Sequence, residues 1–339
     1  MKNITIKDIA KECGVSITAV SFVLNGKESS VSSETAKKIQ EVCRLHNYQP
    51  SYIAASLKNK HTNTVGLLVP DIENGYYARI VKCFEEKIRK NGYSLLTISS
   101  GKNLEDFEFN LRRIINKCVD YCVIIPPSFV EKQPQRIKQL VEYVSKLDTP
   151  IVVLDRKVEA FKAPMVLNDD IQSGYLATSY LIANGHRRIA CITGPNNVSS
   201  SIGRLEGYKK ALEENNIPFD PSLVFEGDYH FESAIEIAKS TLLDNSIKAY
   251  FAFNDTMAYG LYNIATSMDI NVGSDISIVG IDNNPFSDIV HPGLTSVKPN
   301  INLLCESVIN FLFNDTKATG TILVEPELVE RKSVKNVKA

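Results

Sequence analysis

Along most of the chain, short apolar runs alternate with segments whose hydrophobic residues recur at helical spacing. Continuous β-branched runs between helices are typical of parallel strands covered on both faces. A break near FKAPMVLND divides the runs into two series, so the pattern predicts two doubly wound, Rossmann-like α/β subdomains with a cleft between them. The runs are TVGLLVPD, YSLLTISS, YCVIIPPS and PIVVLDR, then RIACITGP, LVFEGDY, AYFAFND and ISIVGIDN.

Residues 1–49 follow a different pattern, with helical segments and no strand-like run. Ala10 and Gly14 are spaced as in a helix-turn-helix, where a small residue lets two helices approach and glycine supplies the positive φ of the turn. Any helical hairpin can carry such a pair, so the spacing alone is a weak signal. Three helices are predicted after the capping residues Thr5, Ser16 and Ser32, and they end near Cys13, Asn25 and His46.

The second of these helices has an unusual outer face. Val20 and Val23 fall on one side at 100° per residue, whereas Thr18 and Phe22 fall roughly opposite. The second helix of a helix-turn-helix lies in the DNA major groove, where a phenyl ring can pack on thymine methyl groups. The alternative is that Phe22 covers a gap against a neighbouring subunit or linker.

Charge is unevenly distributed along the chain. The first 62 residues contain nine lysines and arginines against five aspartates and glutamates, so they carry +4 and leave −5 for the rest of a chain whose net charge is −1. Joined to the three capped helices, this asymmetry predicts binding to double-stranded DNA, although a lysine-rich helix is often only a solvated face. The expected contacts are Thr5, Ser16, Ile17, Thr18, Ser21, Phe22, Asn25, Ser32 and Thr35.

Residues 50–63 predict a hinge helix followed by a linker. The helical part lasts only about two turns, which is marginal for a free helix in water. An apolar residue on a short basic segment can open a base step in the minor groove while lysines contact phosphates. The alternative is an ordinary interdomain linker. The residues expected to contact DNA here are Ile53, Ala54, Leu57 and Lys58.

Composition excludes several other classes of site. The seven cysteines are scattered without a C-x-x-C pair, and the five histidines show no metal-ligand spacing, so we expect reduced thiols, no metal and no cofactor. The N-terminus lacks a secretory signal and no apolar run is long enough to span a membrane, which indicates a cytoplasmic protein.

Several motifs resemble, in order and across nearly the whole chain, the LacI/GalR family of bacterial transcription regulators. The resemblance implies a helix-turn-helix headpiece, a hinge helix and a core similar to periplasmic sugar-binding proteins. It assigns Ile17, Thr18 and Phe22 to base-reading positions and Leu57 to the intercalating hinge leucine. The family usually has arginine or histidine at position 22, so Phe22 predicts a methyl-rich contact in place of a guanine bond. The motifs are TIKDIAKECGVSITAVSFVLNG, NYQPSYIAASLK, GLLVPDIENGYYARIV, NGHRRIACITGP, FNDTMAYG, VGIDNNP and HPGLTSV.

Ligands of open α/β sheets bind beyond the carboxyl ends of the strands, and the resemblance places an effector there. Charge-assisted bonds from a pair such as Arg204 and Asp282, with aromatic walls, suit a sugar or sugar derivative. Asp255 is more simply read as a helix cap, and Arg156 as a structural salt-bridge partner. The expected effector contacts are Asp71, Tyr76, Tyr77, Asp155, Arg156, Arg204, Tyr229, Asn254 and Asp282.

The resulting prediction is a repressor whose operator affinity a small effector controls, and not an enzyme. The chain contains neither the G-x-G-x-x-G of a dinucleotide enzyme nor the G-x-x-x-x-G-K-[ST] of an NTPase. A solute-binding protein or a sugar-metabolising enzyme on this scaffold remains the alternative. A pseudo-palindromic operator calls for a homodimer, and the end of the chain has no leucine heptads for a tetramer. The predicted domains are a headpiece (1–49), a hinge (50–63), an N-subdomain (64–163 and 296–325) and a C-subdomain (164–295 and 326–339).

Overall fold

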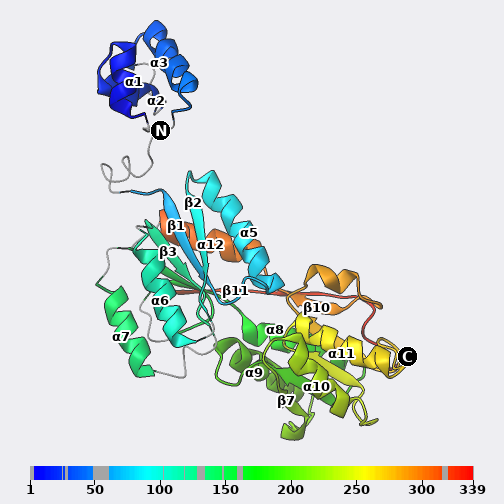
Figure 1. Cartoon of the computed structure of the whole chain (residues 1–339). Helices are drawn as coiled ribbons and strands as arrows, with labels where there is room; N and C mark the ends of the chain where they lie inside the picture. The colour runs from blue at the N-terminus through cyan, green and yellow to red at the C-terminus, as the bar shows by residue number, and fades with distance from the viewer. Residues whose placement is uncertain are drawn as a thin grey trace. The chain divides into compact units, whose positions relative to one another are not determined.

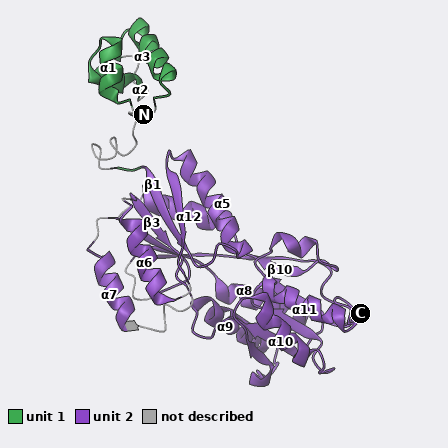
Figure 2. Cartoon of the chain, viewed as in Figure 1, with its two compact units in different colours: residues 1–62 green, residues 63–339 purple. Residues whose placement is uncertain are grey.

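The computed structural model divides into two compact units, residues 1–62 and 63–339 (Figure 2). The predicted contacts Asn25, Ile53, Ala54, Leu57 and Lys58 lie outside the described residues, as does most of the predicted hinge. The structure describes residues 4–24, 26, 30–48, 61–101, 103–117, 119–127, 134–146, 149–158, 163–314 and 320–338.

The first unit contains the three predicted helices, α1 (Ile6–Cys13), α2 (Ile17–Leu24) and α3 (Ser33–Leu45) (Figure 1). Thr5 and Asp8 form the predicted capping box, and Gly14 ends α1 in the left-handed region with φ 69°. All three helices contribute to one small apolar core that includes Ile9, Val20 and Ile39. The helix-turn-helix prediction is therefore confirmed at the level of its local geometry.

The second unit contains two six-stranded sheets, each of which forms one lobe (Figure 1). The first sheet has the order β11-β5-β4-β3-β1-β2, and all its strands are parallel. Its strands are β1 (Thr64–Val69), β2 (Ser94–Ser99), β3 (Tyr121–Ile124), β4 (Ile151–Asp155), β5 (Met165–Asn168) and β11 (Thr321–Val324). One face is covered by α5 (Gly75–Lys90) and α12 (Ile301–Phe313), and the other by α6 (Leu104–Ile115) and α7 (Pro134–Val144).

The second sheet has the order β12-β10-β9-β8-β6-β7, in which only β12 is antiparallel to its neighbour. Its strands are β6 (Ile189–Thr193), β7 (Val224–Glu226), β8 (Ala249–Ala252), β9 (Ser277–Ile281), β10 (Thr295–Lys298) and β12 (Glu327–Val329). Its helices are α8 (Asp170–Ala183), α9 (Ser199–Glu214), α10 (Phe231–Thr241) and α11 (Asp255–Ser267), with short 3₁₀ turns η3 (Pro221–Leu223) and η4 (Pro285–Asp288).

The chain passes between the lobes three times, and two of these passages differ from the predicted boundaries. Strand β5 pairs with β4 and β11, so the first lobe extends to Asn168 instead of residue 163. Strand β10 pairs with β9, so the second lobe extends to Lys298 instead of residue 295. Each error placed a four-residue strand wholly or mostly in the wrong lobe, because the sequence of so short a strand does not reveal which sheet it joins. In the described part of the chain, no helix combines the length and the apolarity that a membrane span requires.

Candidate DNA-binding and effector sites

Helix α2 has a buried side and an outer side. Ser16 Oγ accepts a hydrogen bond from Ala19 N at 3.1 Å and so begins the helix. Val20 and Val23 are buried, and Thr18 is exposed. Phe22 is half-buried but is not among the described residues that form or line the apolar core of this unit. Its ring therefore has a surface that a ligand can cover.

Hydroxyl groups mark the N-termini of α1 and α3. Thr5 Oγ1 donates to Asp8 Oδ2 at 2.6 Å, and Ser32 Oγ accepts from Thr35 N at 3.2 Å. The Ser32 and Thr35 hydroxyl oxygens are 2.8 Å apart. These positions suit phosphate contacts because helix N-termini present unpaired N–H groups and positive dipole ends. The other predicted contacts of the unit are Ile17, which is 44% exposed, and Ser21, which is half-buried.

In the core, Asp155 is the centre of a buried hydrogen-bond network at the end of β4. Tyr76 Oη donates to Asp155 Oδ1 at 2.6 Å, and Asn168 Nδ2 donates to the same oxygen at 2.7 Å. Tyr77 Oη lies 3.5 Å from Asp155 Oδ2. Burial raises the pKa of both tyrosines and the Asp155 charge adds to this, although the Arg156 charge lowers the pKa of Tyr77, so both phenols stay protonated donors. The Asn168 Oδ1 atom is buried without a hydrogen-bond partner among the described residues.

Arg156 lies between aromatic rings from both lobes. Its guanidinium carbon is 5.8 Å from the centroid of the Tyr77 ring and 5.7 Å from that of Tyr229. The side chain is 11% exposed, and its Nε is 3.9 Å from Asp155 Oδ2, which is too long for a hydrogen bond. Within the described range Nε has no hydrogen-bond partner, and Nη1 reaches only the Pro126 carbonyl at 3.4 Å. The predicted salt bridge is weak, and the cation retains donors for a ligand.

Arg204, a predicted effector contact, forms a buried ion pair with Asp170. Its Nε donates to Asp170 Oδ1 at 2.8 Å, and its Nη1 donates to the Phe253 carbonyl. In the described structure no hydrogen bond joins Arg204 to Asp282, but the two groups are close enough for each charge to affect the pKa of the other. The Asp170 charge raises the pKa of Arg204 against the effect of burial, which keeps the guanidinium charged. Arg204 lies 5.9 Å from the Tyr229 ring centroid and so borders the same site.

Asp282 follows β9 and is buried, and within the described residues no hydrogen bond reaches its carboxyl group. Burial raises its pKa to about 8, although the Arg204 and Arg79 charges act in the opposite direction. The group is therefore largely protonated at neutral pH and can donate as well as accept a hydrogen bond.

Tyr229 contributes the aromatic wall from the second lobe. Its Oη lies 2.7 Å from Ser201 Oγ and 3.0 Å from Ser200 Oγ, which fixes the ring. Its backbone has φ 72°, and Asp155 and Asp282 also lie in the positive-φ region at 72° and 108°. Non-glycine residues held there are strained and cluster at functional sites.

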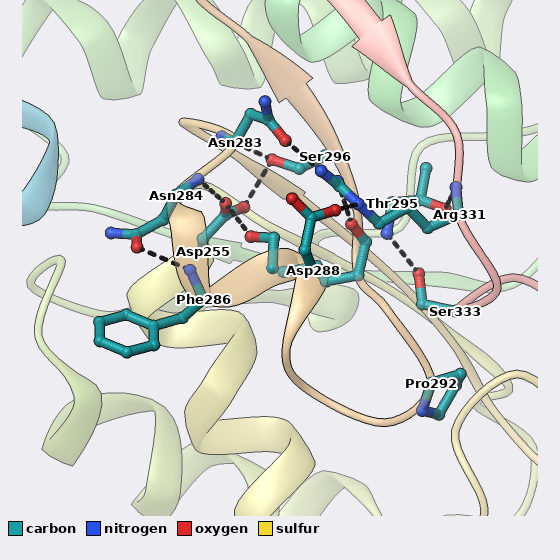
Figure 3. Close-up of polar contacts among 12 residues, drawn as sticks. Asp255, Asn283, Asn284, Phe286, Asp288, Pro292, Thr295, Ser296, Arg331 and Ser333 are labelled. Carbon is teal, nitrogen blue, oxygen red and sulfur yellow. Dashed lines mark hydrogen bonds and ion pairs between the residues drawn. The ribbon is translucent and has the colours of Figure 1, made fainter.

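The cap of α11 is Asn254, and the expectation that Asp255 caps this helix is wrong. Asn254 Oδ1 caps α11 by accepting from Met257 N at 2.9 Å, and its Nδ2 donates to the Tyr229 carbonyl at 2.9 Å. Asp255 is fully buried and accepts from the Ser287 and Ser296 hydroxyls at 2.6 Å each (Figure 3). Asn254 therefore supports the ring of Tyr229, and Asp255 is not the cap.

Asp71 does not join this cluster through any contact of the described residues, because its Oδ1 accepts from Glu73 N at 2.8 Å in a local turn. The structure adds residues that sequence reasoning missed, namely Asn168, Asp170, Ser200, Ser201 and Arg79. Asn168 is the last residue of β5, so the rule that ligands bind beyond the carboxyl ends of parallel strands could have identified it. No group of three possible metal ligands occurs within the described ranges, and the six cysteines in them are free.

Comparison with known proteins gives matches along the whole chain. The model of "Bacterial regulatory proteins, lacI family" matches residues 5–51, and that of "Periplasmic binding protein-like domain" matches residues 178–334. The "HTH-type transcriptional repressor PurR" of Actinobacillus pleuropneumoniae serotype 3 (strain JL03) is 34% identical over 340 residues, which cover 98% of this chain and 99% of that protein.

Two solved structures are similar to the chain as well. The lac repressor dimer bound to operator and the anti-inducer ONPF has a TM-score of 0.86 at 25% identity, with 98% of this chain and 100% of that chain covered. A LacI family transcriptional regulator from Enterococcus faecium with bound ribose has a TM-score of 0.69 at 25% identity, with 81% of this chain and 99% of that chain covered.

Proposed function

This chain belongs to the LacI family of bacterial regulatory proteins, and from that membership we propose which of its residues read DNA and which bind its effector. The protein is a DNA-binding transcriptional repressor with a helix-turn-helix unit and a periplasmic-binding-protein-like core that takes a small effector. The family assignment therefore answers the question of enzyme or regulator in favour of the regulator.

The proposed base-reading residues are Ile17, Thr18 and Phe22. Support comes from the division of α2 into a buried valine side and an outer side that carries Thr18 and the half-buried Phe22. None of the three side chains can make the bidentate bond by which arginine reads guanine. The operator half-site therefore contains thymine methyl groups opposite this face.

We assign the phosphate contacts to the helix-capping hydroxyl groups of Thr5, Ser16 and Ser32. We assign the side chain that opens a base step in the minor groove to Leu57 of the hinge, residues 50–63. Two such hinges and headpieces in a homodimer would meet a pseudo-palindromic operator, and the lac repressor of similar fold is bound to its operator as a dimer. A DNA target also means that the protein works in the bacterial cytoplasm.

The proposed effector is a sugar or sugar derivative held between the lobes by Tyr77, Asp155, Arg156, Tyr229 and Asp282. The under-paired guanidinium of Arg156, flanked by aromatic rings from both lobes, is the observation that carries this proposal. Arginine donors and carboxyl groups bind hydroxyls, and tyrosine rings cover the apolar face of a sugar ring. The bound ribose of the Enterococcus faecium relative supports the same class. The residues that hold these contacts in position are Arg204, Tyr76 and Asn254. Asp71 remains a proposed effector contact at the edge of the site.

Effector and operator are linked because both bind the same chain. A ligand that favours one arrangement of the lobes must change DNA affinity by the factor by which DNA changes ligand affinity.

Thermal unfolding of the full chain with ribose, cellobiose, glucose 6-phosphate and hypoxanthine tests the ligand class. A ligand that binds only the folded protein raises Tm as its concentration exceeds Kd. We expect a sugar to raise Tm, and Arg156→Met to abolish the increase while the exposed control Arg89→Met retains it. If only hypoxanthine raises Tm, the sugar proposal is wrong, and the effector is a flat heterocycle that stacks between Tyr77 and Tyr229.

A further inference from the structure

The loop that follows β9, residues 282–284, adopts a backbone that its own residues disfavour. Asp282 has φ 108° and Asn283 has φ 46°, so two consecutive non-glycine residues lie in the positive-φ region. Asparagine tolerates this region better than aspartate does at so large a φ. Such a loop persists only where its surroundings hold it in place.

The second lobe holds this loop from one side (Figure 3). Asn284 N donates to Asp255 Oδ2 at 2.7 Å, and Asn283 N donates to Ser296 Oγ at 2.9 Å. Ser296 Oγ in turn donates to Asp255 Oδ1 at 2.6 Å. Arg331 Nη2 donates to Asn283 Oδ1 at 2.7 Å. Asp282 N also donates to the Val297 carbonyl at 2.9 Å, so all three backbone N–H groups and one side chain of the loop are fixed from α11, β10 and the C-terminal segment.

The first lobe reaches the same loop from the other side through α5. Arg79 Nη1 donates to the Asp282 carbonyl at 2.9 Å and to the Asn283 carbonyl at 2.5 Å. The N-terminus of α5 also packs closely here, since a Cβ atom on Gly75 would collide with the Asn284 side chain. Arg79 is thus the member of α5 that bonds across the lobes, two residues after the effector wall residue Tyr77.

We propose that Arg79 is a latch that couples the opening of the two lobes to the position of Asp282. When the lobes separate, its bonds to the Asp282 and Asn283 carbonyls must break, and the strained loop loses its support on that side. When they close, the same bonds return Asp282 to the effector. Arg79 is a positioning residue, because it acts through the carbonyl groups of the loop. The relevance of Asp282 to the effector rests on the proposed function, whereas the latch itself does not.

The latch can be tested by the distance between the lobes in the free, full-length protein. Spin labels coupled to p-acetylphenylalanine at Lys90 on α5 and at Glu206 on α9, both exposed positions, report that distance by pulsed electron paramagnetic resonance. Dilution with unlabelled protein removes distances between subunits. We expect a narrow distribution for the otherwise unchanged chain and an additional, longer population for Arg79→Met, which keeps the aliphatic stem but no donor. Arg79→Lys, which can still donate to a carbonyl, should restore much of the narrow distribution.

The matched control is Arg89→Met on the same helix. Arg89 is 73% exposed and its ion pair is with Glu85 of α5, so the distribution should not change. An Arg79→Met protein with unchanged circular dichroism and an unchanged distance distribution would overturn the latch. If Arg79→Met does not fold, Arg79→Gln, which is too short to reach both carbonyls, takes its place with the same two outcomes. Failure of the unchanged protein to select any sequence from a random duplex library would overturn the proposed function, and it would not affect the distance comparison.

Discussion

Phe22 is proposed to read bases, and its contact can be measured directly. After an operator has been selected from a random library, each thymine is replaced by deoxyuridine, which lacks only the methyl group. We expect Phe22→Ala to lower the operator affinity by about 1 kcal/mol or more, because an apolar contact with a methyl group is lost. At the contacted thymine, deoxyuridine should weaken binding of the unchanged protein but not of Phe22→Ala.

The control for the Phe22→Ala and deoxyuridine comparison is Leu45→Ala, which also shortens an apolar side chain to a methyl group. Leu45 is 74% exposed and lies at the end of α3. Its response to deoxyuridine should match that of the unchanged protein. If Phe22→Ala responds to every deoxyuridine as the unchanged protein does, the ring reads no methyl group, and the alternative of a contact with a subunit or linker gains support.

Asp282 makes the stability of the core depend on pH. Its pKa is about 8 in the folded protein, above the ordinary value of 3.8, so the folded state binds the proton more tightly than the unfolded chain. The stabilisation is complete below pH 4 and is lost as the pH rises through 8, with a slope of at most about 1.4 kcal/mol per pH unit. Besides Arg204 and Arg79, which lower this pKa, Asp255 and Asp155 face the group and raise it.

Asp282→Asn removes this titration. In urea unfolding at pH 5, 7 and 9, the variant should therefore lose less stability between pH 5 and pH 9 than the unchanged chain. Asp269→Asn, at an exposed position, serves as the control and should keep the original pH dependence. If the free energy of unfolding changes equally with pH in Asp282→Asn and in the unchanged chain, the Asp282 carboxyl group titrates near its ordinary pKa.

Single residues also show where sequence reasoning about the site reached its limit. Asp155 and Asp282 were found because polar residues at strand ends meet at one edge of a parallel sheet. Asn168 obeys the same rule but was missed, because its strand was assigned to the other lobe. The helix cap was placed at Asp255 instead of Asn254 because either of two adjacent residues can cap a helix, and only the extended backbone at Asn254, with φ −151°, decides between them.

At the scale of elements, the contact between α8 and α9 positions Arg204 beside Asp170. The two helices approach so closely that a Cβ atom on Gly207 would overlap the Ile171 carbonyl, and one on Gly174 would overlap the Arg204 carbonyl. The ion pair between Arg204 and Asp170 could not be predicted from spacing, because it depends on this separation of the helices.

Gly207→Ala should therefore destabilise the protein by about 1–3 kcal/mol or more in urea unfolding, because the added methyl group meets backbone that cannot move away cheaply. Glu206→Ala, one residue earlier and exposed, should change stability by less than about 0.5 kcal/mol. If the two variants unfold alike, the helices can separate at little cost, and the close approach is not what fixes Arg204.

At the scale of the whole molecule, the alternation of apolar runs and helices predicted the two parallel sheets and the separate helical unit. The positions at which the chain passes between lobes were less predictable. The passages follow β5, β10 and β11, and the first two occur before the sheet that the chain leaves has received its last strand. The partner β11 comes from residues more than 150 positions after β5. Hydrophobic patterning is local, whereas strand pairing at such separations is decided by the packing of the complete sheet.

The division of charge between the two units predicts where DNA affinity resides. Residues 1–62 carry +4 and residues 63–339 carry −5, and none of the apolar clusters described in the second unit includes a residue of the first. A protein that begins at residue 63 should therefore keep its core and its cooperative thermal unfolding but lose binding to duplex DNA. For the full chain, log K should fall linearly with log salt, with a slope of about −0.9 for each phosphate neutralised. Fluorescence anisotropy at 50 and 200 mM salt measures both proteins on one labelled duplex, and salt-sensitive binding by the truncated protein would place the DNA contact in the core.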